Sequence, residues 1–156
     1  MSMSTHILHH GMYFEDFEVG QQFSTNTARA TKDEVIQFAK EWDQQYFHLD
    51  EEAAKKSTFG MLVGSGLHVL MLSWKLFDRT GILRNTAVAG VGFDDLRFKA
   101  PFLPDEDIHV ELSVLEKSLT SKSDRGKLRV KFNTYDSSHQ NIFTFTLIVL
   151  VACRPC

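Results

Sequence analysis

The sequence has few of the features that mark secreted or nucleic-acid-binding proteins. Of its 156 residues only 2 are cysteine and 3 are proline, and the formal net charge is -3. Cys153 and Cys156 form one C-x-x-C at the C-terminus, and without a second pair they do not predict a structural zinc site. The acidic balance lacks the basic footprint of a nucleic-acid-binding protein. We therefore expect no nucleic-acid partner, and reduced thiols in a cytoplasmic protein.

Long hydrophobic runs are also missing. The longest, LIVLVAC at 147–153, is far shorter than the roughly 18–20 residues of a membrane-spanning helix. The N-terminus has no positively charged region ahead of an apolar stretch, so no secretory signal is expected. Of the 7 histidines, only His6 and His10 near the N-terminus have an H-x-x-x-H spacing, and no pair has the H-E-x-x-H spacing. The sequence thus predicts no membrane partner and no metal site.

The length fits one domain with a sizeable core. We expect residues 1–12 to form an N-terminal tail and residues 13–156 a single domain. Phenylalanine is abundant, with 13 copies in the chain. This abundance indicates an aromatic-rich core, an apolar pocket or a buried subunit interface, and composition alone does not separate the three.

Three segments have helical patterns: TKDEVIQFAKEW at 31–42, DEEAAKK at 50–56 and LHVLMLSWKLFDRT at 67–80. The first begins with a capping box, Thr31 with Glu34 three residues on, and carries one apolar face. The third ends before Gly81, a typical C-terminal cap. Because that helix is apolar on nearly every side, we expect it to be buried all round.

The remaining segments have strand patterns: QQFSTNTARA at 21–30, VAGVGFDDLRF at 88–98, DIHVELSVLEK at 107–117, GKLRVKFNTYD at 126–136 and NIFTFTLIVLV at 141–151. Polar turns, and Pro101 with Pro104, separate the last four, so antiparallel pairing is expected. A curved antiparallel sheet wrapped around one central helix would bury that helix. This is the α+β hot-dog fold, whose free sheet edge predicts a homodimer.

The stretch WDQQYFHLD contains the most suggestive pair of residues, Asp43 and His48. On a continuous helix their side chains would point about 140° apart. They converge only if the helix ends at Asp43 and the chain folds back, with Gln44 and Gln45 bonding the freed carbonyls. A carboxylate and an imidazole in reach of one water form an acid/base pair. The alternative is a solvent-facing helix end and a satisfied, half-buried histidine.

A glycine-rich stretch, FGMLVGSG at 59–66, leads into the apolar helix. Gly60, Gly64 and Gly66 permit close approach of a ligand to the backbone. The helix start that follows offers unpaired N–H groups that can polarise a carbonyl oxygen or bind a phosphate. The alternative is that these glycines only allow a tight entry of the chain beneath the sheet.

Four motifs together resemble the family of MaoC-like dehydratases and (R)-specific enoyl-CoA hydratases, which have the hot-dog fold. They are YFEDFEVGQ from Tyr13 to Gln21, the segment Asp43-Gln44-Gln45-Tyr46-Phe47-His48, the set Phe59, Gly60, Val63, Ser65 and Gly66, and the set Arg97, Phe98 and Pro101. The resemblance extends from Tyr13 to about Val151.

The resemblance implies an acyl dehydratase or enoyl-CoA hydratase. Asp43 and His48 would hold the water that adds across the double bond of a trans-2-enoyl-CoA thioester. The N–H of Gly66 would polarise the thioester carbonyl, and Ser65 would help shape that oxyanion site. Coenzyme A is part of the substrate, so no separate cofactor is expected. A homodimer, or a larger assembly of such dimers, is the expected state.

The family pattern also indicates the substrate pocket, which we expect to be formed by Trp42, Tyr46, Phe47, Phe59, Gly60 and Trp74. Trp42, Tyr46 and Trp74 are departures from the family pattern, and their bulk is expected to narrow or reshape the pocket. Two alternatives remain: an acyl-CoA thioesterase, and a non-catalytic acyl-CoA-binding module whose site these side chains close. Residues 65–77 contain no acid, which disfavours the thioesterase, because those enzymes usually place a carboxylate on the buried helix.

Overall fold

A computed structural model describes Ser2–Met3 and residues 10–156 of the chain. The helical elements are η1 (Phe14–Asp16), α1 (Lys32–Trp42), α2 (Tyr46–Leu49), α3 (Glu51–Ala54) and α4 (Gly66–Thr80). The strands are β1 (Ser2–Met3), β2 (Gln22–Ser24), β3 (Ala87–Phe98), β4 (His109–Leu119), β5 (Arg125–Tyr135) and β6 (Asn141–Ala152). None of the helices in this part of the chain combines the length and apolar character of a membrane span.

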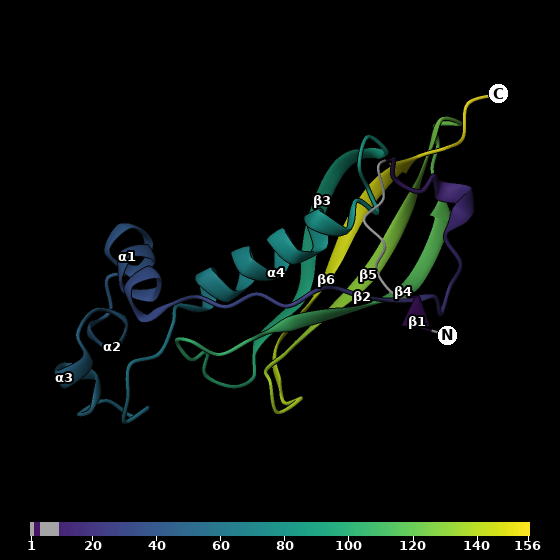
Figure 1. The fold of residues 1–156 in the computed structure, drawn as a ribbon. Helices are drawn as coiled ribbons and strands as arrows, with labels where there is room; N and C mark the ends of the chain where they lie inside the picture. The colour runs from purple at the N-terminus through teal and green to yellow at the C-terminus, as the bar shows by residue number, and fades with distance from the viewer. Residues whose placement is uncertain (1, 4–9) are drawn as a thin grey trace.

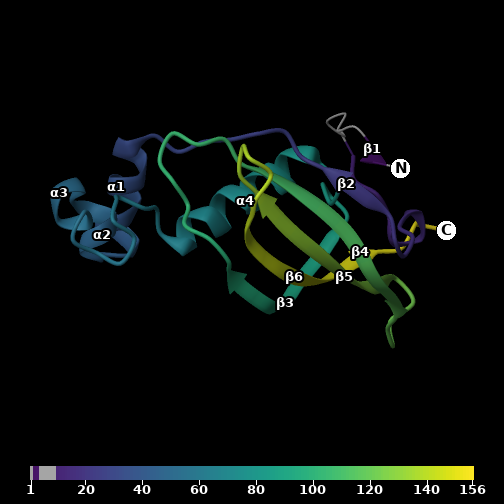
Figure 2. The same cartoon turned by 90° about the horizontal axis from the view of Figure 1, so that it is seen from below.

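The strands form one sheet in the order β1-β2-β4-β5-β6-β3. Every pairing is antiparallel except that of the short β1 with β2. The sheet curves around α4, which lies along its inner face (Figures 1 and 2). The expected α+β hot-dog fold is therefore confirmed.

One strand pairing differs from the sequence-based expectation. β3 pairs with β6, the last strand, and not with β4, which follows it in the chain. The linker between β3 and β4 contains Pro101 and Pro104, whose nitrogens cannot donate hydrogen bonds, and it makes no hairpin. Instead, Gly64 N donates to the carbonyl of Phe102 at 2.6 Å, so this linker binds the chain just ahead of α4.

Helix α4 is buried mainly on the side that faces the sheet. Its buried side chains are His68, Val69, Leu70, Ser73, Leu76, Phe77 and Thr80. Leu67 and Met71, one turn apart, are 48% and 50% exposed. The expectation of burial all round is therefore wrong for this chain, because one curved sheet covers only part of the helix circumference. Gly81 closes the helix with a φ of 73°, as the sequence predicted.

An aromatic core fills the space between α4 and the sheet. The ring of Phe132 on β5 stacks on Phe145 of β6 with centroids 4.4 Å apart and meets Phe77 of α4 edge-on at 5.0 Å. Trp74 lies parallel to Phe132 at 6.2 Å. Many of the phenylalanines thus contribute to the core, which was one of the three explanations of their abundance.

The N-terminal segments are only partly as expected. Residues 1 and 4–9 of the expected tail lie outside the described residues, whereas Ser2–Met3 pair with β2. Gly11 N donates to Arg84 O, and Met12 N donates to Ile82 O, both at 2.8 Å. Gly11 and Met12 are therefore bound to the segment that follows α4. The extended segment 21–30 forms a regular strand only over Gln22–Ser24 and then follows β4 through isolated contacts.

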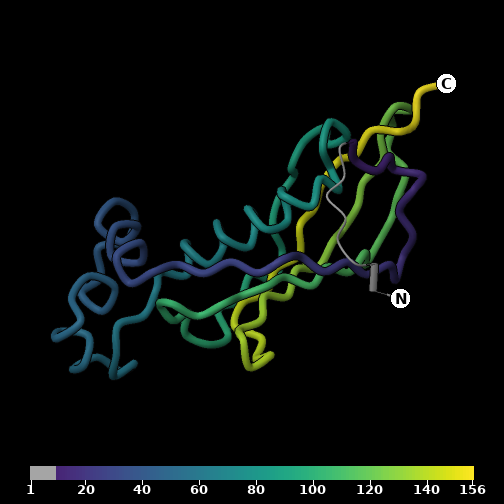
Figure 3. The backbone as a smooth tube through the Cα atoms, viewed as in Figure 1, coloured from purple at the N-terminus to yellow at the C-terminus, as the bar shows by residue number. Residues whose placement is uncertain are grey.

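Helices α1, α2 and α3 gather beyond the N-terminal end of α4, at the opposite end of the molecule from the two chain termini (Figure 3). The start of α1 agrees with its sequence. Thr31 accepts a hydrogen bond from Glu34 N, and the Glu34 carboxylate accepts one from Thr31 N. This helical cluster places Asp43 and His48 beside the N-terminal end of α4.

We expect His68 on α4 to make the fold sensitive to acid. Its ring stacks on Phe38 at 4.3 Å, meets Phe102 edge-on, and its Nδ1 has no hydrogen-bond partner. Burial lowers the pKa of His68 from its ordinary value of 6.5, against a smaller opposing effect of Glu34. The unfolded chain therefore binds this proton at a higher pH than the folded chain does. The contribution of neutral His68 to the free energy of unfolding is therefore fully present above about pH 6.5. It is lost as the pH falls towards the pKa of His68 in the folded chain.

We expect His68→Phe to reduce this acid sensitivity, since phenylalanine keeps the ring contacts and cannot be protonated. Tm measured at pH 7.5 and 5.5 should fall less in the variant than in the parent protein. His10→Asn, at an exposed histidine, serves as the control and should retain the parental pH dependence. An equal fall in the parent and in His68→Phe would show that burial of His68 does not govern acid stability.

Candidate active site

The end of α1 positions Asp43. Helix α1 stops at Trp42, and Asp43 is its C-cap, with φ -157° and ψ 79°. The Gln44 side chain donates to Lys40 O at 2.7 Å, which satisfies a freed carbonyl of the last turn. Gln45 N donates to Asp43 O at 2.8 Å, and α2 begins at the next residue. The helix end and fold-back that the sequence required are therefore present.

His48 lies in α2 and is buried beside Asp43. Its Nδ1 is 2.5 Å from the carbonyl oxygen of Val63. Because a carbonyl only accepts, Nδ1 must donate, and in the neutral ring Nε2 then carries the lone pair. Nε2 lies 3.4 Å from Asp43 Oδ2. This gap exceeds a normal direct hydrogen bond, and one water can lie about 2.8–3.0 Å from both atoms.

Ser65 also holds the Asp43 carboxylate. Its hydroxyl donates to Asp43 Oδ2 at 2.6 Å and accepts from Leu67 N at 3.1 Å. Ser65 is the N-cap of α4 and is fully buried. The structure therefore gives Ser65 a contact that the sequence reasoning missed, since it was considered only for shaping an oxyanion site. Its place as a serine at a helix N-cap was the available signal.

A cavity of about 470 Å³ opens in front of this pair. Its lining residues are Asp43, Phe47, His48, Phe59, Val63, Gly64, Gly66, Leu67, Val69, Phe98, Lys99, Ala100, Pro101 and Phe102. Asp43 is the only carboxylate in this lining and Lys99 the only lysine or arginine. A mostly apolar cavity with a few converging polar groups is typical of a small-molecule site.

Gly66 brings backbone to the cavity wall. It is the first residue of α4, so the helix supplies no acceptor for its N–H, and the helix dipole adds positive character there. A Cβ at this position would lie 2.4 Å from the Phe98 ring. The absence of a side chain therefore lets the ring cover the helix start.

The structure brings only some of the expected pocket residues to the cavity. Phe47 and Phe59 line it, whereas Trp42, Tyr46, Gly60 and Trp74 do not. Trp42 is 65% exposed and borders a separate hollow beside α1, and Tyr46 is 51% exposed. Trp74 packs in the aromatic core, and Gly60 occupies a turn with φ 70°. The expected narrowing of the pocket by Trp42, Tyr46 and Trp74 is therefore corrected for this chain: their side chains point elsewhere.

Sequence reasoning missed much of the cavity lining, which the end of β3 and the linker after it supply. Phe98 is the last residue of β3, Lys99 follows it, and Phe102 lies in the linker that binds Gly64. The signal was present as the motif containing Arg97, Phe98 and Pro101. Its spacing indicates family resemblance but does not say that this segment faces Asp43.

Comparison with known proteins agrees with this fold. A model of the MaoC like domain matches residues 16–135. The uncharacterized protein YdeM of Bacillus subtilis (strain 168) is 33% identical over 140 residues, covering 90% of this chain and 99% of that protein. The crystal structure of a MaoC-like dehydratase from Rhodospirillum rubrum superposes with a TM-score of 0.88 at 32% identity, covering 94% of this chain and 100% of that one.

A further structure supports the fold alone. The (R)-hydratase PhaJ1 from Pseudomonas aeruginosa has a TM-score of 0.69 at 23% identity, covering 92% of this chain and 88% of that chain. Fold and site together define a hot-dog protein whose carboxylate and imidazole face an apolar cavity at the start of the central helix. The chain belongs to the MaoC-like dehydratase family.

Proposed function

We propose that the protein is a hydro-lyase that reversibly adds water across the double bond of a trans-2-enoyl-CoA thioester. The observation that carries this proposal is the 3.4 Å approach of His48 Nε2 and Asp43 Oδ2 at the wall of a cavity that also contains Gly66. Membership of the MaoC-like dehydratase family and likeness to the Rhodospirillum rubrum dehydratase support the reaction class.

In the proposed reaction, a water molecule lies between Asp43 and His48. His48 Nε2 accepts one proton of the water, while Asp43 accepts a hydrogen bond from the other. The oxygen bonds to the β-carbon, and the electron pair of the double bond moves through the α-carbon to the thioester oxygen. The Gly66 N–H stabilises the resulting enolate. Transfer of the proton from His48 to the α-carbon completes hydration, and the reverse sequence is dehydration.

The cavity lining suits the two parts of such a substrate. Phe47, Phe59 and Val63 provide apolar wall for an acyl chain. Lys99 places one positive charge at the same cavity, where it can meet a phosphate of coenzyme A. Trp42 and Tyr46 do not line the cavity, which supports an open site over a closed, non-catalytic one.

We also propose a homodimer formed through β3. This strand ends the sheet and has only β6 as a neighbour within the described residues. Val91 is 58% exposed and Phe93 is 46% exposed on it, and Leu67 and Met71 expose apolar surface on α4. An exposed apolar edge strand readily pairs with a second copy.

The expected solution mass is twice that of the 17.8 kDa chain. We expect Val91→Lys to shift the protein towards the monomer, because a buried, unpaired lysine would face the second copy. Light scattering coupled to gel filtration measures both masses, with Val19→Lys, at another exposed valine, as the control. A dimer that survives Val91→Lys unchanged would place the interface elsewhere.

The activity is tested by mixing the purified protein with trans-2-enoyl-CoA of several chain lengths. Hydration removes the absorbance of the conjugated enoyl thioester and leaves the thioester bond intact. A thioesterase would release free coenzyme A, which a thiol reagent detects. A non-catalytic binding module would raise Tm with the ligand and leave the absorbance unchanged. Inertness across all chain lengths would contradict the proposed function.

A further inference from the structure

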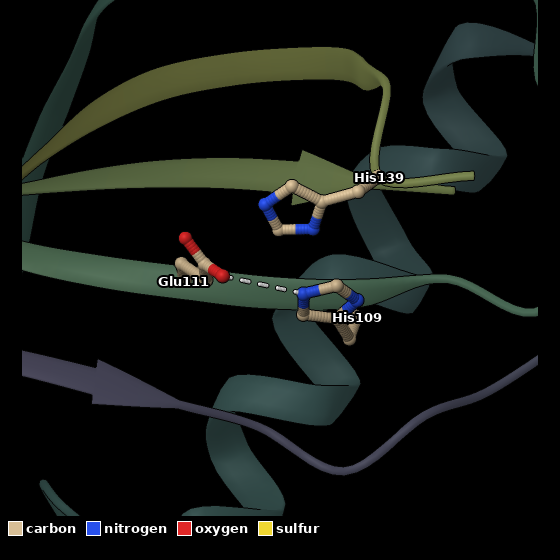
Figure 4. Close-up of side chains that lie close together, drawn as sticks. All are labelled: His109, Glu111 and His139. Atoms are coloured by element: carbon tan, nitrogen blue, oxygen red, sulfur yellow. Dashed lines mark ion pairs between the residues drawn. The ribbon is translucent and has the colours of Figure 1, made fainter. Parts of the chain in front are cut away.

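A second group of reactive side chains lies on the outer face of the sheet. It consists of His109, Glu111 and His139, whose ligand atoms all lie within 4.8 Å of one another. None of the three lines the cavity of Asp43 and His48. Figure 4 shows the three side chains converging on one space, two from β4 and one from the turn between β5 and β6.

The two β4 residues are arranged by strand geometry. Successive side chains of a strand point to opposite faces, so His109 and Glu111 share a face while Val110 between them is buried. His109 Nε2 lies 3.5 Å from Glu111 Oε1. Two ligand atoms of one tetrahedral ion, each at about 2.0–2.1 Å from it, are about 3.3 Å apart. This pair therefore already has the separation that one metal ion requires.

The third residue is held by a structured turn. His139 has a φ of 60°, and its N–H donates to Asp136 O at 3.0 Å. The Asp136 carboxylate accepts from Ser138 N and Gln140 N, both at 2.9 Å. The His139 ring stacks on Tyr135 at 4.4 Å with planes 4° apart. Tyr135 on β5 pairs with His109 on β4. The turn therefore holds the His139 ring close to the His109 ring.

We propose that His109, Glu111 and His139 bind one divalent transition-metal ion of the zinc type. Two imidazoles and a carboxylate suit such ions, and three protein ligands leave a coordination position for water. Glu111 and His139 are partly or fully exposed, so small rotations can close the remaining gaps. The bound ion would tie β4 to the β5–β6 turn and so stabilise the folded chain.

This proposal departs from the expectation of no metal site. That expectation considered only histidine spacings typical of helices. Here the ligands are two residues apart on a strand and, for His139, far along the chain at a turn. Only the β4–β5 pairing brings them together.

The test uses a tag-free, chelator-treated protein titrated with Zn²⁺ in a calorimeter and with Co²⁺ by visible absorption. We expect one ion per chain with a Kd in the micromolar range and tetrahedral Co²⁺ bands. Tm should rise by roughly 5–10 °C at a free Zn²⁺ concentration of about 100 times Kd. Glu111→Gln and His139→Asn should each weaken binding at least about tenfold. Asparagine is chosen at residue 139 because it tolerates a positive φ.

Two controls separate this site from other metal-binding groups. Glu116→Gln removes an exposed carboxylate from the same strand, and the pair Cys153→Ser with Cys156→Ser removes both thiols. Both should bind Zn²⁺ as the parent does. The proposal is overturned if Kd lies in the millimolar range or weaker, or if Glu111→Gln and His139→Asn bind as tightly as the parent. Loss of binding in the cysteine variant alone would also overturn it.

Discussion

Replacing Asp43 with asparagine is expected to lower kcat/KM for enoyl-CoA hydration by about 10²–10⁴-fold, the usual contribution of a positioned acid or base. Asparagine keeps an oxygen that can accept the 2.6 Å hydrogen bond from Ser65, so the fold should persist. It lacks the negative charge that orients a water beside His48. Initial rates of enoyl absorbance loss measure the effect, and Tm verifies folding.

His48→Ala is expected to cost a similar factor, because it removes the lone pair that accepts the water proton. If the two residues act on one water, the double variant should be little slower than the slower single variant. Glu41→Gln, at an exposed carboxylate on the same helix as Asp43, should retain parental rates. Parental rates in Asp43→Asn, or full multiplication of the two losses in the double variant, would contradict joint action on one water.

Gly64→Ala is expected to lower the free energy of unfolding by about 1–3 kcal/mol, the usual cost of overpacking a core. The added Cβ would lie 2.4 Å from the ring of Phe102, which is only 3% exposed and has no space to move into. The same substitution would strain the 2.6 Å hydrogen bond from Gly64 N to Phe102 O. Urea unfolding monitored by tryptophan fluorescence measures the loss.

Gly66→Ala provides the matched comparison. Its Cβ would also approach a ring at 2.4 Å, but Phe98 is 57% exposed and can rotate away. We therefore expect near-parental stability and a loss in kcat/KM of about 10²-fold, because the displaced ring and helix start disturb the oxyanion position. Equal stability of the two variants would contradict the role of Gly64 in packing against Phe102. Parental activity of Gly66→Ala would contradict the role of Gly66 at the oxyanion position.

Local signals allowed the start and end of α1 to be predicted from sequence. The capping box at Thr31 and Glu34 involves neighbouring residues only, and the bond from Gln44 to Lys40 O ends the helix within one turn. The exposure of the Trp42 side chain was not predictable in the same way. Val35, Phe38, Ala39 and Trp42 recur at helical spacing and predict one apolar face, yet Trp42 is 65% exposed whereas Val35 and Ala39 are buried.

The sequence indicated Asp43 and His48 as the candidate acid/base pair, but it did not predict how their side chains are oriented. The tautomer of His48 depends on the carbonyl of Val63, and the orientation of Asp43 depends on Ser65. Both partners come from a separate stretch of chain, whose place is fixed by the contact of Gly64 with Phe102. Such long-range contacts leave no local pattern, and the pairing of β3 with β6 escaped prediction for the same reason.

The fate of the water oxygen tests the central claim most directly. Trans-2-enoyl-CoA is incubated with the protein in water enriched in ¹⁸O, and the products are analysed by mass spectrometry. The Asp43–His48 account predicts intact 3-hydroxyacyl-CoA labelled at the β-carbon, with label greatly reduced in Asp43→Asn. Label in a free carboxylic acid, or no label in any product, would contradict it.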